Sequence, residues 1–250
     1  MRHLGSRART RPGRLLATQQ YLAQHESQLL SPGSTVVDFG FGQTPVTTVE
    51  WADALDPRIA VVAIEHNATH VETARRLAPQ LAIVHGGFET LATLGPVTVV
   101  RAMNVLRGYR AEDLAGATEA LAAPLIDGGL LLEGSTDTAG DVMVASLLRK
   151  GQHALTLEGL LFHTTFARGF APWLFRDSLP RAFRRSTRPG TPLYAFLEAW
   201  QRAFAKTQGP LSERFDASIA QLPGATRWAD GGLRWSATEL HFEPSRPHPL

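Results

Sequence analysis

Short apolar runs and amphipathic stretches alternate along the first 150 residues of the chain. Runs rich in Val, Ile and Leu predict strands that are covered on both faces, and apolar residues three and four positions apart predict helices. The strands are expected at 35–39, 59–65, 81–84, 97–102 and 129–133, and the helices at 14–30, 44–55, 67–78, 111–122 and 140–150. Because strand, helix and next strand form right-handed crossovers, this order predicts a doubly wound α/β domain with a mostly parallel sheet.

The alternation changes beyond Gly151. Residues 154–165 and 232–242 predict two more strands, which bring the expected sheet to seven, with a mostly helical insertion between them. Within the insertion, Thr191 is expected to cap a helix that begins at Pro192 and has one apolar stripe. The stripe consists of Leu193, Phe196, Leu197, Trp200 and Phe204.

The chain is therefore expected to have four parts. They are a basic segment and helix at 1–33, an α/β core at 34–165, the helical insertion at 166–231, and a final strand and tail at 232–250. The position of the insertion suits a substrate lid, because it follows the core and precedes the last strand.

Composition narrows the class of protein. The 250 residues are 44% hydrophobic and 19% charged and include no cysteine, which is typical of one large globular domain without disulfides. Nowhere do 18 apolar residues follow one another without a charge, so no membrane span is expected. The arginine-rich N-terminus lacks the apolar run of a secretory signal. These features predict a soluble, cytoplasmic protein.

The net charge of +2 hides a strong asymmetry. Residues 1–25 hold five arginines and no acid, residues 26–141 hold 15 acids and six arginines, and residues 142–250 hold 14 basic and eight acidic residues. The segment 168–188 alone has six arginines, interleaved with aromatic side chains. Two interpretations stay open: the basic flanks fold against the acidic centre, or they bind a phosphate-bearing partner such as RNA.

The stretch TVVDFGFGQTP at 35–45 joins a strand end, an acid and two glycines. Glycines at the carboxyl end of a first parallel strand let the backbone approach a ligand. A nucleoside triphosphate loop would need Gly-Lys-Ser/Thr, and no lysine lies in 34–56. A dinucleotide loop would need a small residue where Pro45 stands, and Asp38 would face the pyrophosphate. A cationic ligand such as S-adenosylmethionine (SAM) instead suits a carboxylate there.

These residues resemble the class I SAM-dependent methyltransferases. Asp38, Gly40 and Gly42 match the family motif acid-x-Gly-x-Gly after the first strand, and Glu65 matches the acid that ends the second strand. The stretch RAMNVLRGY at 101–109 matches the fourth motif in position, and the resemblance covers roughly residues 34–150. It is strongest to a bacterial group that shares the Thr-Pro after the glycines, a GGFE segment and the RAxNVLRxY segment. The resemblance implies a Rossmann-like methyltransferase fold and SAM as the cofactor.

The resemblance also implies roles for single residues. Glu65 takes the ribose hydroxyls, His66 flanks the adenine, and Asn104 lines the methionine end. Gly87 stands where the family has an aspartate beside the adenine amino group, and Thr44 replaces a third glycine. The implied cofactor-binding set is Asp38, Gly40, Gly42, Thr44, Glu65, His66, Gly87, Phe88 and Asn104.

Two geometric expectations accompany these roles. Asp38 and Glu65 are expected at strand ends that face the cleft, where neither supports the core. Arg14, or else Arg11, is expected to bind the carboxylate of SAM, because an acidic cleft otherwise lacks a cation for it. The N-terminal helix is then expected to cover the cofactor cleft.

Methyl transfer from a sulfonium depends on alignment and desolvation more than on a base, so no catalytic triad is required. Arg107 and Tyr109 are weak candidates for a direct role at the rim of the cleft. Glu133, Asp137 and Asp141 are further candidate carboxylates, but capping of the helix expected after them explains two of the three.

The sequence thus predicts a SAM-dependent methyltransferase with a small or medium-sized acceptor. The alternatives are an RNA methyltransferase that uses the insertion, an NAD(P)-binding oxidoreductase and a SAM-binding protein without turnover. The arginines of 168–188 are expected in the wall opposite the sulfonium, with Trp173 and Phe175 turned inward. His66 and His70 lie four residues apart without an evident third ligand, so no metal is expected.

Overall fold

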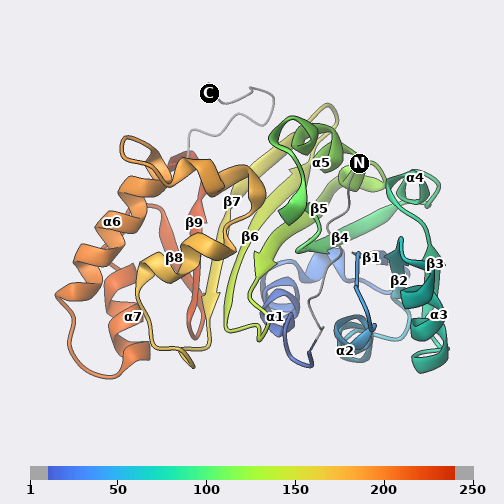
Figure 1. Ribbon diagram of the computed structural model, residues 1–250, viewed down its shortest axis with the longest axis horizontal. Helices are drawn as coiled ribbons and strands as arrows, with labels where there is room; N and C mark the ends of the chain where they lie inside the picture. The colour runs from blue at the N-terminus through green and yellow to red at the C-terminus, as the bar shows by residue number, and fades with distance from the viewer. Residues whose placement is uncertain (1–10, 240–250) are drawn as a thin grey trace.

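A mixed sheet of nine strands runs through residues 11–239, the part of the chain that the computed structural model describes. The strand order is β3-β2-β1-β4-β5-β6-β7-β9-β8 (Figure 1). The parallel strands are β1 (Thr35–Phe39), β2 (Ala60–Glu65), β3 (Ala82–His85), β4 (Val97–Met103) and β5 (Leu125–Thr136). The antiparallel strands are β6 (Val142–Lys150), β7 (Leu155–Thr164), β8 (Ala225–Ala229) and β9 (Gly232–Ser236).

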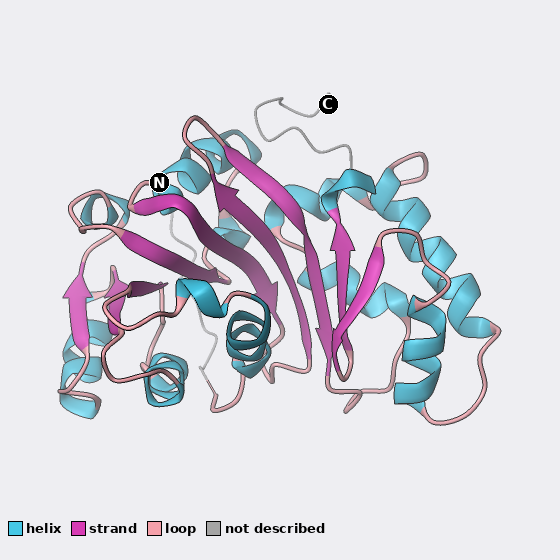
Figure 2. Ribbon diagram, turned by 180° about the vertical axis from the view of Figure 1, so that it is seen from behind, coloured by secondary structure: helices cyan, strands magenta, loops and turns pink. Residues whose placement is uncertain are grey.

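Helices cover both faces of this sheet (Figures 1 and 2). One face is covered by α1 (Leu16–His25), α2 (Val46–Ala54) and α3 (Ala68–Leu77), which pack on alternate side chains of β1, β2 and β4. The opposite face is covered by α4 (Phe88–Leu91), α5 (Leu114–Ala122), α6 (Pro192–Ala205) and α7 (Leu211–Ile219). Helices on both faces of a central parallel sheet confirm the predicted doubly wound α/β fold.

Short 3-10 helices complete the connections between these elements. They are η1 (Ser27–Leu29), η2 (Leu106–Gly108), η3 (Ala111–Asp113), η4 (Pro172–Ser178), η5 (Arg181–Ser186) and η6 (Ala237–Glu239). Two of them, η4 and η5, belong to the insertion and lie over the sheet face that α5 and α6 also cover. In the described part of the chain, none of the helices is long and apolar enough to span a bilayer.

The expected helix at 140–150 is wrong, because this segment is the strand β6. Val142 and Val144 pack on one face of the sheet, while Met143, Ala145 and Leu147 pack on the other. A strand buried on both faces is apolar throughout, so periodicity alone does not distinguish it from a buried helix. The strand pairs antiparallel with β5. Together with β8, it brings the sheet to nine strands, two more than the seven that the sequence predicts.

A second unpredicted strand, β8, pairs with β9 as a hairpin. The two residues between them are Asp230 and Gly231, and Gly231 has a positive φ of 63°. Asp-Gly between two β runs is a strong hairpin signal, because the turn needs positive φ angles. The expected strand at 232–242 is shorter than predicted: β9 ends at Ser236, and residues 240–242 lie outside the described residues.

Helix caps were predicted with mixed success. The Thr191 side chain accepts a hydrogen bond from the Tyr194 N–H, and Pro192 begins α6, as expected. The residues of its apolar stripe are all buried. The helix expected from residue 44 begins instead at Val46, with Pro45 before it and no side-chain cap.

A buried ion pair connects β1 to β4 beneath the glycine loop. The Arg101 side chain is fully buried, and its Nε and Nη2 donate to Asp38 Oδ1 and Oδ2 at 3.0 and 2.8 Å. The Thr48 hydroxyl donates to Asp38 Oδ2 at 2.6 Å, and the guanidinium lies over the Trp51 ring, 4.2 Å from its centroid. The expectation that Asp38 faces the cleft and supports no core is therefore wrong.

We expect Asp38→Ala to lower the free energy of unfolding by about 3–5 kcal/mol, because it leaves the Arg101 charge buried without a partner. Urea unfolding followed by circular dichroism measures the loss. Asp56→Ala is the matched control, since Asp56 forms an exposed pair with Arg58 and its removal changes stability little.

The double variant Asp38→Leu/Arg101→Met separates loss of the pair from loss of packing. We expect it to be more stable than Asp38→Ala alone, because it buries no unpaired charge. An Asp38→Ala variant that is as stable as Asp56→Ala would contradict this account of the pair.

Candidate functional site

The glycine loop lies where the strand order reverses. Parallel strands β2 and β4 lie on either side of β1, and Gly40 and Gly42 follow the carboxyl end of β1. Both have positive φ, 75° and 84°, which favours glycine. A Cβ on Gly40 would stand 2.8 Å from Cγ2 of Val105, so the loop also packs too tightly for a side chain. Open α/β sheets bind ligands at this kind of switch point.

Glu65 holds this loop in place from the end of β2. Its Oε2 accepts a hydrogen bond from the Gly42 N–H at 3.0 Å, and its Oε1 accepts one from the Asn67 N–H at 3.0 Å. The side chain is 4% exposed, and His66 Nδ1 lies 2.8 Å from Oε1 while the His66 ring is largely exposed. The carboxylate thus borders the glycine loop, at the end of β2.

Asp38 differs from Glu65 although both acids stand near strand ends. Both Asp38 oxygens accept hydrogen bonds from Arg101, and one also accepts from Thr48. Side chains alternate along β1, so Asp38 points to the face that α1 and α2 cover. This carboxylate supports the loop from below, and the hydrogen bonds that it accepts come from protein side chains.

Aromatic rings line the other side of the loop. Phe88, at the start of α4, stacks on Phe39 of β1 with 5.2 Å between ring centroids. Tyr109 meets Phe88 edge-on at 6.1 Å, and burial raises the Tyr109 pKa. The Gly87 N–H donates to Glu89 Oε1 at 2.7 Å, so the residue at the position of the family's aspartate has a local partner.

Asn104 ties the end of β4 to the end of β5. Its backbone is left-handed, with φ of 64°, which is uncommon for a residue other than glycine. Its N–H donates to the Gly134 carbonyl at 2.7 Å, and its Oδ1 accepts from the Thr136 N–H at 3.2 Å. Strained backbone of this kind persists where the surrounding structure holds it, often at functional sites.

The segment before α1 crosses the same end of the sheet. Arg14 is largely buried, and its Nε donates to the Asp137 carbonyl at 3.1 Å. The Gly13 N–H donates to Glu50 Oε1 at 2.7 Å. The helix α1 itself packs on the sheet face and does not cover the end of the strands, so the expected cover is wrong for the helix. Residues 11–15 are what lies near the strand ends.

The expected capping role of Asp137 and Asp141 is also wrong, since no helix follows them. Asp137 Oδ1 instead accepts from the Gly140 and Asp141 N–H groups, which builds the turn between β5 and β6. Its Oδ2 pairs with Arg168 Nη1 at 3.3 Å. Asp141 Oδ1 accepts from the Thr165 hydroxyl. Both acids thus shape the connections around the strand ends.

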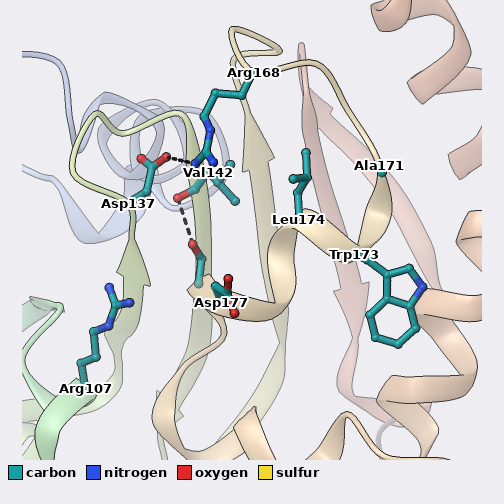
Figure 3. Close-up of a pocket in the computed structure, with 9 residues that line it drawn as sticks. Arg107, Asp137, Val142, Arg168, Ala171, Trp173, Leu174 and Asp177 are labelled. Atoms are coloured by element: carbon teal, nitrogen blue, oxygen red, sulfur yellow. Dashed lines mark hydrogen bonds and ion pairs between the residues drawn. The ribbon is translucent and has the colours of Figure 1, made fainter.

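A cavity of about 320 Å³ opens beside this turn, between the strand ends and the insertion (Figure 3). Figure 3 shows Arg168 reaching to Asp137, and the Arg107 guanidinium pointing toward the same carboxylate. The charged residues of its wall come from η2, the turn between β5 and β6, η4 and the loop before η4, and Leu174 and Trp173 add apolar surface. The charged set is Arg107, Asp137, Arg168 and Asp177.

The insertion contributes less to this wall than the sequence predicts. Arg176, Arg185 and Arg188 are exposed, and Phe175 is fully buried in the core, where it stacks on Trp200. Trp173 does line the cavity, with its ring packed against Tyr194. The inward turn of Phe175 is therefore wrong, because its side chain is in the core, and the place of Trp173 and Arg168 opposite the sulfonium stays a prediction.

Glu133 is a buried acid under the insertion. It is 5% exposed and points to the sheet face that η4 and η5 cover, as does Val144 of β6. No described residue donates a hydrogen bond to its carboxyl group. Burial raises the pKa of Glu133 to about 8, although the charge of Arg184 lowers it to a smaller extent. The carboxyl group is thus mostly protonated at neutral pH.

Comparison with known proteins finds likeness in structure but not in sequence. No family model and no curated protein matches the chain. The plantazolicin methyltransferase BamL, in complex with a desmethylPZN analogue and SAH, matches with a TM-score of 0.42 and 14% identity over 50% of this chain and 46% of that one. The mitomycin 7-O-methyltransferase MmcR matches with a TM-score of 0.39 and 23% identity, over 49% of this chain and 36% of that one.

A SAM-dependent methyltransferase from Geobacter sulfurreducens, in complex with S-adenosyl-L-homocysteine, matches with a TM-score of 0.38 and 23% identity, over 50% of this chain and 48% of that one. The chain therefore matches less than half the length of each of these three proteins. All three of these proteins are methyltransferases. At these scores the likeness assigns neither a substrate nor a site residue to this chain.

We expect Glu133→Gln to remove a pH-dependent loss of stability. The pKa of Glu133 in the folded protein, about 8, lies above the ordinary value of 4.5. The contribution of this carboxyl group to the free energy of unfolding is therefore complete below pH 4.5 and is lost as the pH rises through 8. The difference in free energy of unfolding, variant minus wild type, should be roughly 2–5 kcal/mol larger at pH 9 than at pH 4. This magnitude follows from about 1.4 kcal/mol for each unit of pKa shift.

Urea unfolding of both proteins across this pH range measures the difference. Glu72→Gln, on the exposed side of α3, is the matched control and should give a difference that does not change with pH. The same pH-independent difference for Glu133→Gln would show that its carboxyl group titrates normally.

Proposed function

We propose that this protein is a SAM-dependent methyltransferase that acts on a small or medium-sized acceptor. One observation carries the proposal: the Gly40–Gly42 loop, with two positive φ angles, lies at the switch point of the sheet with the Glu65 carboxylate against it. Backbone N–H groups beside a buried carboxylate suit a ligand that has both a hydroxylated ribose and a positive charge.

The residues present fit SAM at some positions and not at others. Glu65 suits a ribose hydroxyl, because it stands at the end of β2 and its Oε2, which accepts from the Gly42 N–H of the loop, keeps a second lone pair. Phe88, His66 and the backbone of Gly87 suit the adenine end. Asp38 does not fit a direct role, since its oxygens are occupied by Arg101 and Thr48. Its contribution is to hold the loop.

In this proposal, the acceptor binds in the cavity that Arg107 and Trp173 line, next to the ends of β4 and β5. SAM supplies an electrophilic methyl group on a sulfonium. The protein residues align the acceptor, exclude water and hold Asn104 and the glycine loop fixed on either side. An acceptor that must lose a proton would need a base, and Tyr109 and Arg107 stay weak candidates for a direct role.

Glu65→Gln is expected to raise the SAM dissociation constant about ten- to a hundredfold, because a charged hydrogen bond contributes roughly 1.5–3 kcal/mol. Isothermal calorimetry with SAM, S-adenosylhomocysteine and NADH measures the binding. The control Glu72→Gln should bind as the wild type does. Binding of NADH in place of SAM would support an oxidoreductase and refute the proposal.

Arg14→Gln is expected to weaken S-adenosylhomocysteine binding at least several-fold and to leave 5′-methylthioadenosine binding unchanged. The reason is that methylthioadenosine lacks the amino-acid carboxylate that Arg14 is proposed to bind. Arg11→Gln is the matched control, because Arg11 is exposed. Equal weakening of both ligands would show that Arg14 acts through the fold of the 11–15 segment.

A further inference from the structure

At the edge of the cavity, Arg107 is a cation that has no partner within residues 11–239. Its guanidinium lines the cavity and points toward Asp137 (Figure 3). Among the described residues, none accepts a hydrogen bond from Arg107 or forms an ion pair with it. Asp137 does not compensate it, because its Oδ1 builds the turn and its Oδ2 pairs with Arg168. The five N–H donors of the Arg107 guanidinium are thus available to a ligand.

Two arginines of the insertion reach the same region from η5, which packs against η2. Arg181 Nε donates to the Tyr109 carbonyl at 3.0 Å. Arg184 Nε donates to the Leu179 carbonyl at 3.3 Å, while its buried Nη2 has no hydrogen-bond partner among the described residues. Burial lowers the pKa of Arg184, and the charges of Arg107 and Arg181 lower it further. These three guanidinium groups therefore share one electrostatic environment.

The acids of this region do not balance the positive charge. Glu133 lies under η5, but burial raises its pKa to about 8, so it is mostly neutral at pH 7. The Asp177 carboxylate raises the pKa of Arg184 but is exposed at the wall of the cavity, where water screens its charge. Burial lowers the pKa of the largely buried Arg14, as does the charge of Arg107, so Arg14 adds a further positive charge nearby. Like charges gathered in this way repel one another, and a bound anion would relieve the repulsion.

We propose that the methyl acceptor carries an anionic oxygen group, a carboxylate or a phosphate, which Arg107 binds in this cavity while the nearby charge of Arg184 on η5 adds to the attraction. This inference rests on the proposed function for the identity of the ligand as the acceptor. Guanidinium groups present paired donors that match both anions in geometry and charge. The Arg107 donors, which have no partner among the described residues, lie at the cavity wall and supply such a site.

The dimensions of the cavity favour a free small molecule over the phosphates of RNA. Its volume of about 320 Å³ lies at the lower end of the roughly 300–1,000 Å³ that is typical of small-molecule pockets. Arg107, Arg185 and Arg188 are all exposed, but of these three only Arg107 lines the cavity. A small acid in the cavity contacts Arg107, whereas a polynucleotide would also contact the other two.

The test uses benzoate, phenyl phosphate and the neutral benzamide as probes in ligand-observed NMR titrations. The full chain is titrated with and without saturating S-adenosylhomocysteine. Benzoate or phenyl phosphate should bind and should bind more weakly as salt is added, and benzamide should not bind at the same concentration. Arg107→Gln and Arg184→Gln should each weaken anion binding about ten- to a hundredfold. Comparing the two anions shows whether a carboxylate or a phosphate fits better.

The matched controls are Arg185→Gln and Arg188→Gln, which should leave anion binding unchanged. Equal binding of benzamide, no binding of either anion, or equal weakening by the controls would overturn the inference. Tight RNA binding that is lost in the controls would replace it with an RNA acceptor. Anion binding without binding of S-adenosylhomocysteine would refute the proposed function and leave an anion site, so the two failures are distinguishable.

Discussion

The buried contact between Asp38 and Arg101 is the constraint on which the arrangement of this site depends. Removing two charges from water is costly, and the cost is offset only when every remaining donor and acceptor finds a partner. Arg101 therefore also donates to the Thr18 hydroxyl of α1 at 3.3 Å and to the Thr47 carbonyl of α2 at 3.1 Å. The same contact fixes both helices against β1 and β4, directly beneath the point where the glycine loop leaves the sheet.

This constraint divides the two acids of the predicted motif between two tasks. Asp38 is turned toward the helices and holds the floor of the loop, whereas Glu65 accepts a hydrogen bond from the loop itself. Gly40 then has little freedom, because it packs against Val105 and donates to the Ile64 carbonyl at 2.7 Å. The loop is preorganised by its surroundings, which lowers the entropy cost of binding a ligand there.

The sequence was sufficient for the central sheet and for the place of the glycine loop, because both follow from local patterns. It was not sufficient for the direction of Asp38, which is set by a partner 63 residues away. A signal was present: Arg101 interrupts the apolar run VTVVRAM, and a charge in such a strand needs a buried partner. The strand β6 was missed for another reason, since burial on both faces hides the alternation that identifies a strand.

The first interpretation of the charge asymmetry holds for some of the arginines. Some basic residues of the flanks do fold against acids, as Arg149 does with Glu26 and Glu158 and Arg168 does with Asp137. Arg107 has no such partner among the described residues. Arg107 also lines the cavity, where Arg168 is already paired with Asp137. The fold thus pairs one arginine of this wall internally and leaves the donors of the other to a bound group, and since Arg107 is exposed, added salt should weaken its attraction for an anion.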